Sequence, residues 1–232
     1  MRYLAIAIVL VSMCGCAVAD DIVTMPTANQ LKAGELDAAV YYIDVDAPSP
    51  QPQYVQYQTL YLGLTDRFEL DFHRAAVDNN ETSVVIVGSV KLLSEGLSTP
   101  DLVFGVRNIG QTPTIVGPPG SDIREKSKDA SVFLSAAKTF FFNPMAPGPP
   151  LVRVHLSLGS ADWTLFGEER HKGLFGGLQF LFAPWIGAVV QNDGADTITG
   201  ITIMPPKTGF TLKGGTFGDH SWIGLSWRTD LY

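Results

Sequence analysis

From residue 35 onward, the most regular feature of the chain is the alternation of apolar and polar residues at every second position. In residues 67–76, Phe68, Leu70 and Phe72 alternate with Glu69, Asp71 and His73. Residues 151–159 repeat the pattern, with valines and leucines between Arg153, His155 and Ser157. Successive side chains of a strand point to opposite faces, so this period predicts β-strands with one apolar and one polar face.

Glycine, proline, asparagine and aspartate close these segments, and convincing helical periodicity is absent. The pattern predicts an all-β fold in a single domain, whose strands are 35–46, 53–63, 67–76, 83–93, 101–108, 131–142, 151–159, 173–182, 185–191, 197–204, 209–217 and 221–231.

The connections between these strands alternate between two kinds, which differ in length and composition. One set is mostly short and rich in Gly and Pro, at 64–66, 94–100, 143–150, 183–184 and 205–208. The other includes the longer polar stretches 77–82, 109–130 and 160–172.

Short turns at one end and longer loops at the other are typical of a bacterial outer-membrane barrel. Backbone groups in hydrocarbon have no water to bond, so a sheet there must close its edges. We therefore expect a closed antiparallel transmembrane β-barrel of about 12 strands in the outer membrane. Phe68, Leu70 and Phe72 would then meet lipid. A soluble β-sandwich shows the same alternation with its apolar face as the core, so a secreted or lipid-anchored binding module remains an alternative.

In a barrel, the polar faces of the strands would line the lumen. The residues expected there are Gln56, Gln58, Glu69, Asp71, His73, Arg107, Arg153, His155, Gln179 and Lys213. Aromatic residues near segment ends would suit interfacial girdles, where a ring is half in lipid and half in water. They are Tyr41, Tyr42, Tyr54, Tyr61, Phe140, Phe141, Trp185, Trp222 and Trp227. In a sandwich the same rings would belong to the core.

The first residues have the features of an export signal. Arg2 precedes an apolar run at 3–13, and Ala17-Val18-Ala19 matches the small-residue pattern before a signal-peptidase cut. The expected organisation is a cleaved signal peptide at 1–19, an N-terminal periplasmic segment at 20–34 and the barrel at 35–232. Both cysteines precede that cut, so the exported domain would have no thiol. Cleavage before Cys16 would instead give a lipoprotein, and this alternative stays open.

Charge and motifs narrow the range of functions. The chain has 16 Lys and Arg against 23 Asp and Glu, a formal net charge of −7, which argues against nucleic acid as a partner. No metalloprotease, serine-hydrolase or phosphate-loop motif is present, so we expect no catalytic, cofactor-binding or metal-ligating residues and no enzymatic activity. An enzyme at the barrel rim would need a nucleophile beside His73, His155 or His220, and no spacing identifies one.

Two short features have both a chemical and a structural interpretation. His73 shares a face with Glu69 and Asp71, which could form an acid–base cluster, although a polar lumen wall explains the same residues. The stretch NDGAD at 192–196 could offer carboxylates to calcium. A hairpin turn also explains it, because Asp-Gly suits the positive φ that such a turn needs.

Three stretches resemble the YjbH-type outer-membrane β-barrel proteins, which are associated with exopolysaccharide production. They are residues 25–42, 60–72 and 174–203, and the resemblance is thin from 77 to 172. The matching positions are Pro26, Thr27, Ala28, Gly63, Leu64, Thr65, Asp66, Arg67, Gly176, Gly177, Leu178, Pro184, Asp193, Gly194 and Gly200. The resemblance implies a porin-like barrel that is accessory to export or surface assembly of polysaccharide, or that acts as a narrow pore. Its partners would be outer-membrane lipid, the barrel-assembly machinery and polysaccharide.

Overall fold

A computed structural model describes residues 25–45, 54–77, 81–112, 129–143, 148–165 and 168–231, with the backbone alone at 81–83 and 161–165. These residues form twelve strands. They are β1 (Glu35–Asp44), β2 (Tyr54–Thr65), β3 (Phe68–Val77), β4 (Glu81–Leu93), β5 (Asp101–Arg107), β6 (Ser131–Phe141), β7 (Leu151–Leu165), β8 (Glu168–Ala183), β9 (Ile186–Asn192), β10 (Thr197–Ile203), β11 (Phe210–Phe217) and β12 (His220–Asp230). The signal peptide expected at 1–19 lies outside the described residues.

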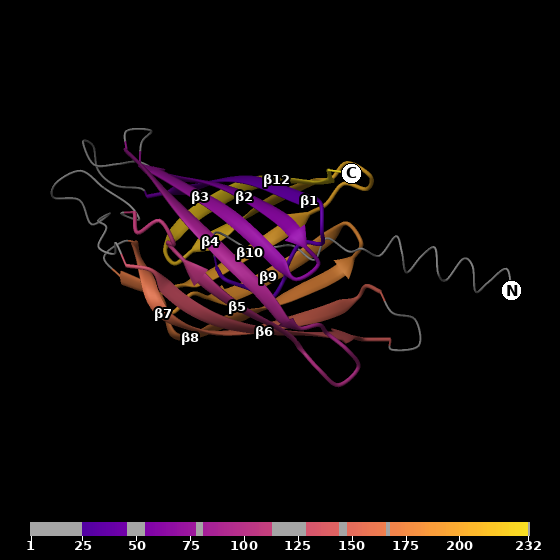
Figure 1. Cartoon of the computed structure of the whole chain (residues 1–232). Coiled ribbons are helices and arrows are strands. Elements are labelled where there is room, and N and C mark those ends of the chain that lie inside the picture. Colours follow the sequence, from indigo (N-terminus) through magenta and orange to yellow (C-terminus); the bar gives the residue numbers. More distant parts are fainter. Residues whose placement is uncertain are drawn as a thin grey trace, which may run out of the picture.

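The sheet closes on itself. Each strand runs antiparallel to its neighbours in the chain, and β1 pairs with β12 from Glu35 opposite Asp230 to Ile43 opposite Trp222. Figure 1 shows the resulting barrel with tilted strands. The predicted all-β, twelve-stranded closed antiparallel barrel is therefore confirmed. The alternative of a two-sheet sandwich is wrong, because no edge separates one sheet from another.

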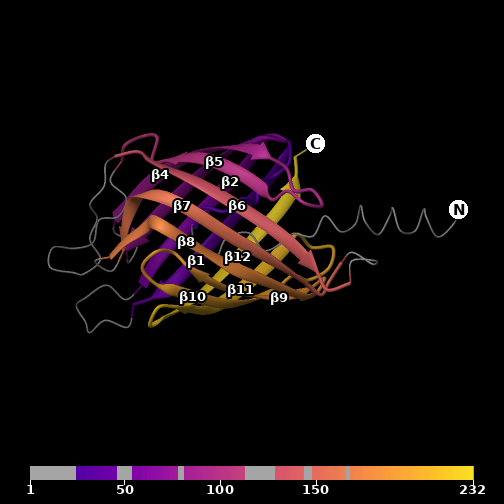
Figure 2. The same ribbon diagram turned by 90° about the horizontal axis from the view of Figure 1, so that it is seen from below.

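Because neighbouring strands are antiparallel, successive connections lie at opposite ends of the barrel (Figure 2). The turns at 66–67 and 184–185 lie at one end, which we call the turn end. At the opposite end, the loop end, β5 ends and β6 begins. The sequence prediction of a polar loop at 160–172 is wrong. β7 and β8 run through most of it, with Trp163 opposite Arg170 and Leu165 opposite Glu168.

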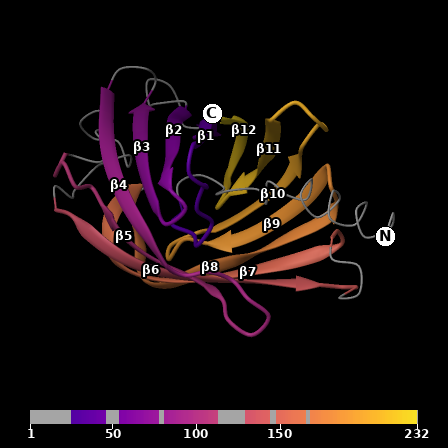
Figure 3. The same cartoon turned by 45° about the vertical axis from the view of Figure 1, so that its right-hand side comes forward.

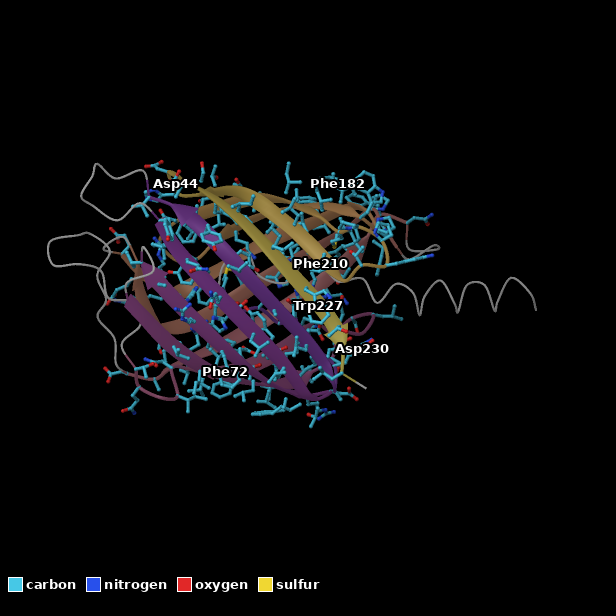
Figure 4. The ribbon with its side chains drawn as sticks, turned by 90° about the horizontal axis from the view of Figure 1, so that it is seen from above. Asp44, Phe72, Phe182, Phe210, Trp227 and Asp230 are labelled. Carbon is cyan, nitrogen blue, oxygen red and sulfur yellow. The ribbon has the colours of Figure 1, made fainter. Side chains whose placement is uncertain are left out.

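The outer face of the barrel is apolar. Phe68 on β3 is 42% exposed, whereas Glu69, Asp71 and His73 are at most 6% exposed, so β3 has the predicted phase. Figure 4 shows side chains covering the outside of the wall. Exposed apolar residues recur around it: Phe104, Leu134, Leu156, Leu158, Leu178, Phe182, Ile201, Ile203, Leu212, Ile223, Leu225 and Trp227. Among the described residues, no helix is long and apolar enough to cross a membrane.

Aromatic residues at the strand ends divide into two groups. Phe140, Phe141, Trp185 and Trp227 are exposed at the turn end, and Tyr42 is exposed at the loop end. Tyr41, Tyr61 and Trp222 instead face inward, which corrects their assignment to a girdle. The inner position of Tyr41 depends on a glycine opposite it, because a Cβ at Gly224 would lie 2.3 Å from the tyrosine ring.

Candidate functional site

The lumen contains a stretch of chain as well as the side chains of its wall. Residues 25–34, which precede β1 and which we call the lumen segment, run inside the ring of strands (Figure 3). Met25 and Ala28 have no exposed surface, and Ala28 packs against a cluster on the wall formed by Val85, Val87, Val103, Phe133 and Ala137. We expected 20–34 to be a periplasmic segment. Its described part lies within the barrel instead.

Polar groups of the wall bind the lumen segment. The hydroxyls of Ser135 and Ser157 lie 3.3 and 3.1 Å from the Pro26 carbonyl oxygen and 2.7 Å from each other. With one proton each, they make two of these three hydrogen bonds at a time, at least one of them to Pro26. The Leu31 amide donates to Glu69 Oε2 at 2.7 Å, and Gln30 Nε2 donates to the Ser89 hydroxyl at 2.6 Å. An irregular segment cannot pair its own backbone, so these side chains supply part of the hydrogen bonding that its buried groups require.

At the turn end, the lumen segment touches the wall closely. The Gly34 amide donates to the Gly63 carbonyl at 2.8 Å, and the Leu231 amide donates to the Gly34 carbonyl at 2.7 Å. A Cβ on Gly63 would lie 1.9 Å from the Lys32 carbonyl oxygen. Only glycine therefore fits at position 63 while the segment stays in place.

A small polar cavity remains between the lumen segment and the wall. Its volume is about 30 Å³, and Glu69, Asp71, His73 and Arg107 line it together with Tyr61 and residues of the segment. A space of this size holds about one or two water molecules. No group of three or more metal-ligating side chains occurs in the part of the chain that the structure describes.

Charged groups cross-link the wall near the turn end. Arg153 donates to Glu95 Oε2 at 2.6 Å and to Asp101 Oδ2 at 2.7 Å, and Glu95 also accepts from the Thr139 amide. Each buried charge thus has an opposite charge in hydrogen-bond contact, which offsets much of the cost of removing it from water.

Charged pairs also link the wall at the β1–β12 seam and beside it. Arg228 Nη2 donates to Asp37 Oδ2 at 2.8 Å across the seam. Lys213 on β11 donates to the Tyr41 hydroxyl at 3.2 Å. The lumen therefore carries charged groups of both signs.

The loop half of the lumen is filled by an apolar cluster of its own wall. Its members are Tyr41, Ile43, Val55, Tyr57, Ala75, Val77, Val189, Ile198, Phe217 and Trp222. Above it lies Arg170, which is fully buried, donates to Asp193 and Asp196 at 2.6 Å each, and stacks 4.6 Å from the centre of the Phe217 ring. We call Arg170, Asp193 and Asp196 the loop-end triad.

The β9–β10 connection holds this triad in place. Asp193 Oδ1 accepts hydrogen bonds from the amides of Ala195 and Asp196, and Gly194 has a φ of +98°. The hairpin-turn interpretation of NDGAD agrees with this geometry. Here its aspartates bind an arginine rather than a cation from solvent.

The predicted lumen residues mostly occupy the inner face. Glu69, Asp71, His73, Arg107, Arg153, His155, Gln179 and Lys213 are at most 6% exposed. Gln56 and Gln58 face outward, which corrects their prediction. In the strand register they lie beside Ala76 and Arg74, on the opposite face from Val55 and Tyr57, which point into the apolar cluster. Gln56 is nevertheless only 8% exposed. The rule that apolar residues face lipid fails on β2, because this level of the lumen is itself apolar.

Several lumen residues were not predicted from the sequence. Arg170 and Asp193 fell in stretches interpreted as connections, and Ser135 lies on the inner face of β6 beside buried Phe133. Strand phase placed Ser157 on the polar face, yet nothing local links it to Pro26, 131 residues away.

Comparison with known proteins gives no family assignment. No protein-family model matches the chain, and no curated protein matches it significantly. Among solved structures, the chain is similar to the N-terminal β-barrel domain of OprF from Pseudomonas aeruginosa, with 9% identity, a TM-score of 0.25, and 86% of this chain and 100% of that chain covered. It is also similar to an outer membrane channel from Pseudomonas putida F1, with 13% identity, a TM-score of 0.37, and 89% and 99% of the two chains covered. At these identities and TM-scores, neither likeness bears on what this chain does.

Proposed function

We propose that the protein is a bacterial outer-membrane β-barrel of the narrow-pore kind, closed in its turn half by its own lumen segment and in its loop half by the apolar cluster of its wall. The observation that carries this proposal is the sidedness of the wall. Its exposed face is rich in leucine, isoleucine and phenylalanine, whereas its inner face buries arginine, aspartate, glutamate and histidine. A barrel that exposes apolar residues and buries charges suits surrounding lipid, and the closed sheet leaves no unpaired backbone edge in it.

The pore is closed in this structure because the lumen segment and the side chains of the wall occupy its interior. The cavity of about 30 Å³ beside the lumen segment is far smaller than the roughly 300–1,000 Å³ of a small-molecule site. The segment is joined to the inner wall by a few hydrogen bonds and apolar contacts. Its departure would open a polar chamber lined by Glu69, Asp71 and Arg107 in the turn half, while the apolar cluster would still fill the loop half.

A role accessory to export or surface assembly of polysaccharide is the part of the proposal that rests on the YjbH-type resemblance. Two of the matching glycines have a packing reason, since a Cβ at Gly63 or Gly176 would lie within 2.4 Å of a backbone oxygen. Those positions therefore support a barrel of this construction more than they support a cargo. The proposal assigns no catalytic chemistry to the lumen, and its partners are membrane lipid and the barrel-assembly machinery.

Two substitutions on β3 test which face of the wall meets lipid and which face meets the lumen. Leu70→Arg puts a charge into lipid and should cost about 2–4 kcal/mol if the site is near the midplane. Asp71→Asn changes the lumen and should be mild. The readout is the fraction of each variant that is recovered from outer membranes and shifts on gels only after boiling. The reverse ranking would contradict a membrane-spanning barrel.

Closure of the turn half by the lumen segment is tested by labelling a cysteine introduced into its cavity, Asp71→Cys, with a water-soluble maleimide. A second variant also replaces residues 25–33 with a Gly-Ser sequence of equal length, which keeps the chain length but removes the docking contacts. We expect slow labelling with the native segment and fast labelling with the Gly-Ser sequence, while conductance in planar bilayers stays low in both because the apolar cluster remains. Equal labelling rates would disprove closure by the segment.

A further inference from the structure

An outward-facing arginine interrupts the apolar wall. Arg74 lies on β3 two residues beyond Phe72 and opposite Gln58 on β2, on the same face as Phe72 and Leu60. Its Nη1 donates to Gln58 Oε1 at 2.9 Å. Guanidinium has five N–H donors, so the amide oxygen engages only part of its capacity.

Arg74 differs from the arginines of the lumen in its counter-charge. Arg153, Arg170 and Arg228 each contact at least one carboxylate at 2.8 Å or less. Within the described ranges, no carboxylate pairs with Arg74. An arginine on a lipid-facing wall is costly near the midplane and tolerated at the interface, where its side chain can extend to charged headgroups.

The surroundings of Arg74 are those of a membrane interface. Gln56 Nε2 donates to the hydroxyl of Tyr42 at 3.0 Å, and the Tyr42 and Tyr54 rings lie 5.9 Å apart. Figure 4 shows Phe72 nearer the loop end than Phe182, Phe210 and Trp227. Arg74 is two residues further toward the loop end. We call Tyr42, Gln58 and Arg74 the outer polar patch; Gln56, which is only 8% exposed, supports the Tyr42 hydroxyl from within the wall.

We propose that the outer polar patch binds the phosphate of a lipid headgroup in the leaflet at the loop end. Guanidinium matches phosphate in bidentate geometry, and tyrosine favours the boundary between acyl chains and headgroups. Leu60 and Phe72, on the same face toward the turn end, offer an apolar surface to the acyl chains. This inference rests on the proposed membrane-spanning barrel, because a soluble protein would present the patch to water.

The test uses the refolded full chain in two kinds of vesicle. One is phosphatidylcholine alone, and the other is a four-to-one mixture of phosphatidylcholine and phosphatidic acid, which carries a phosphomonoester. The readout is the midpoint temperature of the boiling-dependent gel shift. Phosphatidic acid should raise the midpoint of the native protein by about 2–4 °C. Arg74→Gln should abolish that increase, and Arg74→Lys should retain part of it.

The matched control is Arg67→Gln, which removes the same charge from the exposed turn at the other end of β3. It should keep the full effect of phosphatidic acid. Loss of the effect in both variants would indicate general attraction to a charged surface and overturn the site. An equal increase with inorganic phosphate added to phosphatidylcholine vesicles would overturn a lipid headgroup as the ligand. A normal gel shift without any effect of phosphatidic acid would overturn this inference alone, whereas absence of a heat-sensitive barrel in both vesicles would overturn the proposed function with it.

Discussion

The two halves of the lumen are closed in different ways. In the turn half, a separate stretch of chain lies against the wall and is held by hydrogen bonds from Ser135, Ser157 and Glu69. In the loop half, side chains of the strands themselves fill the space, and the loop-end triad lies above them. The first closure can leave the wall intact when it opens. The second cannot, because its members are part of the wall.

This difference separates stability from gating. Substitutions in the loop half should act on unfolding of the whole barrel, since they create cavities or unpaired charges in its wall. Substitutions at the contacts of the lumen segment should act mainly on access to the turn half, measured as the labelling rate of Asp71→Cys. The following changes test that separation, from the largest expected effect to the smallest.

Arg170→Met should have the largest effect. It leaves Asp193 buried without its cation, and breaking such a pair costs about 3–5 kcal/mol. The measurement is urea unfolding of the protein in vesicles. The control is Lys172→Gln on the same strand, whose ion pair with Glu169 is more than half exposed and should contribute about 0–1 kcal/mol. Equal losses in the two variants would show that burial of the loop-end triad does not matter.

Gly63→Ala should release the lumen segment. Its new Cβ would meet the Lys32 carbonyl oxygen at 1.9 Å, and such overpacking typically costs about 1–3 kcal/mol. We expect the segment to move rather than the sheet, so labelling of Asp71→Cys should become faster while the urea midpoint changes little. Gly214→Ala is the control, because its nearest contact would be 3.4 Å from the Trp222 carbonyl oxygen. Unchanged labelling with a large loss of stability would place the strain in the wall instead.

Ser157→Ala should have the smallest effect. It removes one of two hydroxyls that lie within hydrogen-bond distance of the Pro26 carbonyl, and a hydrogen bond of this kind contributes about 0.5–1.5 kcal/mol. The segment should leave the wall about 2–10 times more often, measured as the labelling rate of Asp71→Cys. Thr199→Val removes a hydroxyl pair on the outer face and should leave the labelling rate unchanged.

The wall itself could be predicted from the sequence, because it depends on local alternation. β3 shows the point: Phe68 and Glu69 adopt the exposure that their period of two requires. The same rule failed on β2, where Tyr57 points inward and Gln58 outward. The rule assumes a polar lumen, and the apolar cluster of the loop half breaks that assumption.

The contents of the lumen could not be predicted in the same way. The contact of Pro26 with Ser157 joins residues 131 positions apart, and no periodicity records such a pair. Residues 160–172 have polar character, yet they continue β7 and β8, where Arg170 pairs with Asp193 inside the barrel. In the sequence, a buried arginine of this kind cannot be distinguished from an exposed loop arginine. The difference lies in the carboxylate that pairs with it, which only the structure shows.

The seam between β1 and β12 also predicts an order of assembly. It joins Asp37 to Arg228, 191 positions later, so we expect the ring to stay open on one side until the final strand arrives. Residues 25–34 directly precede β1, at the edge that pairs last. They can be laid against β3 to β7 through that gap, whereas entry after closure would require threading. Partners so distant in sequence make folding slow, which gives the segment time to settle before the ring is sealed.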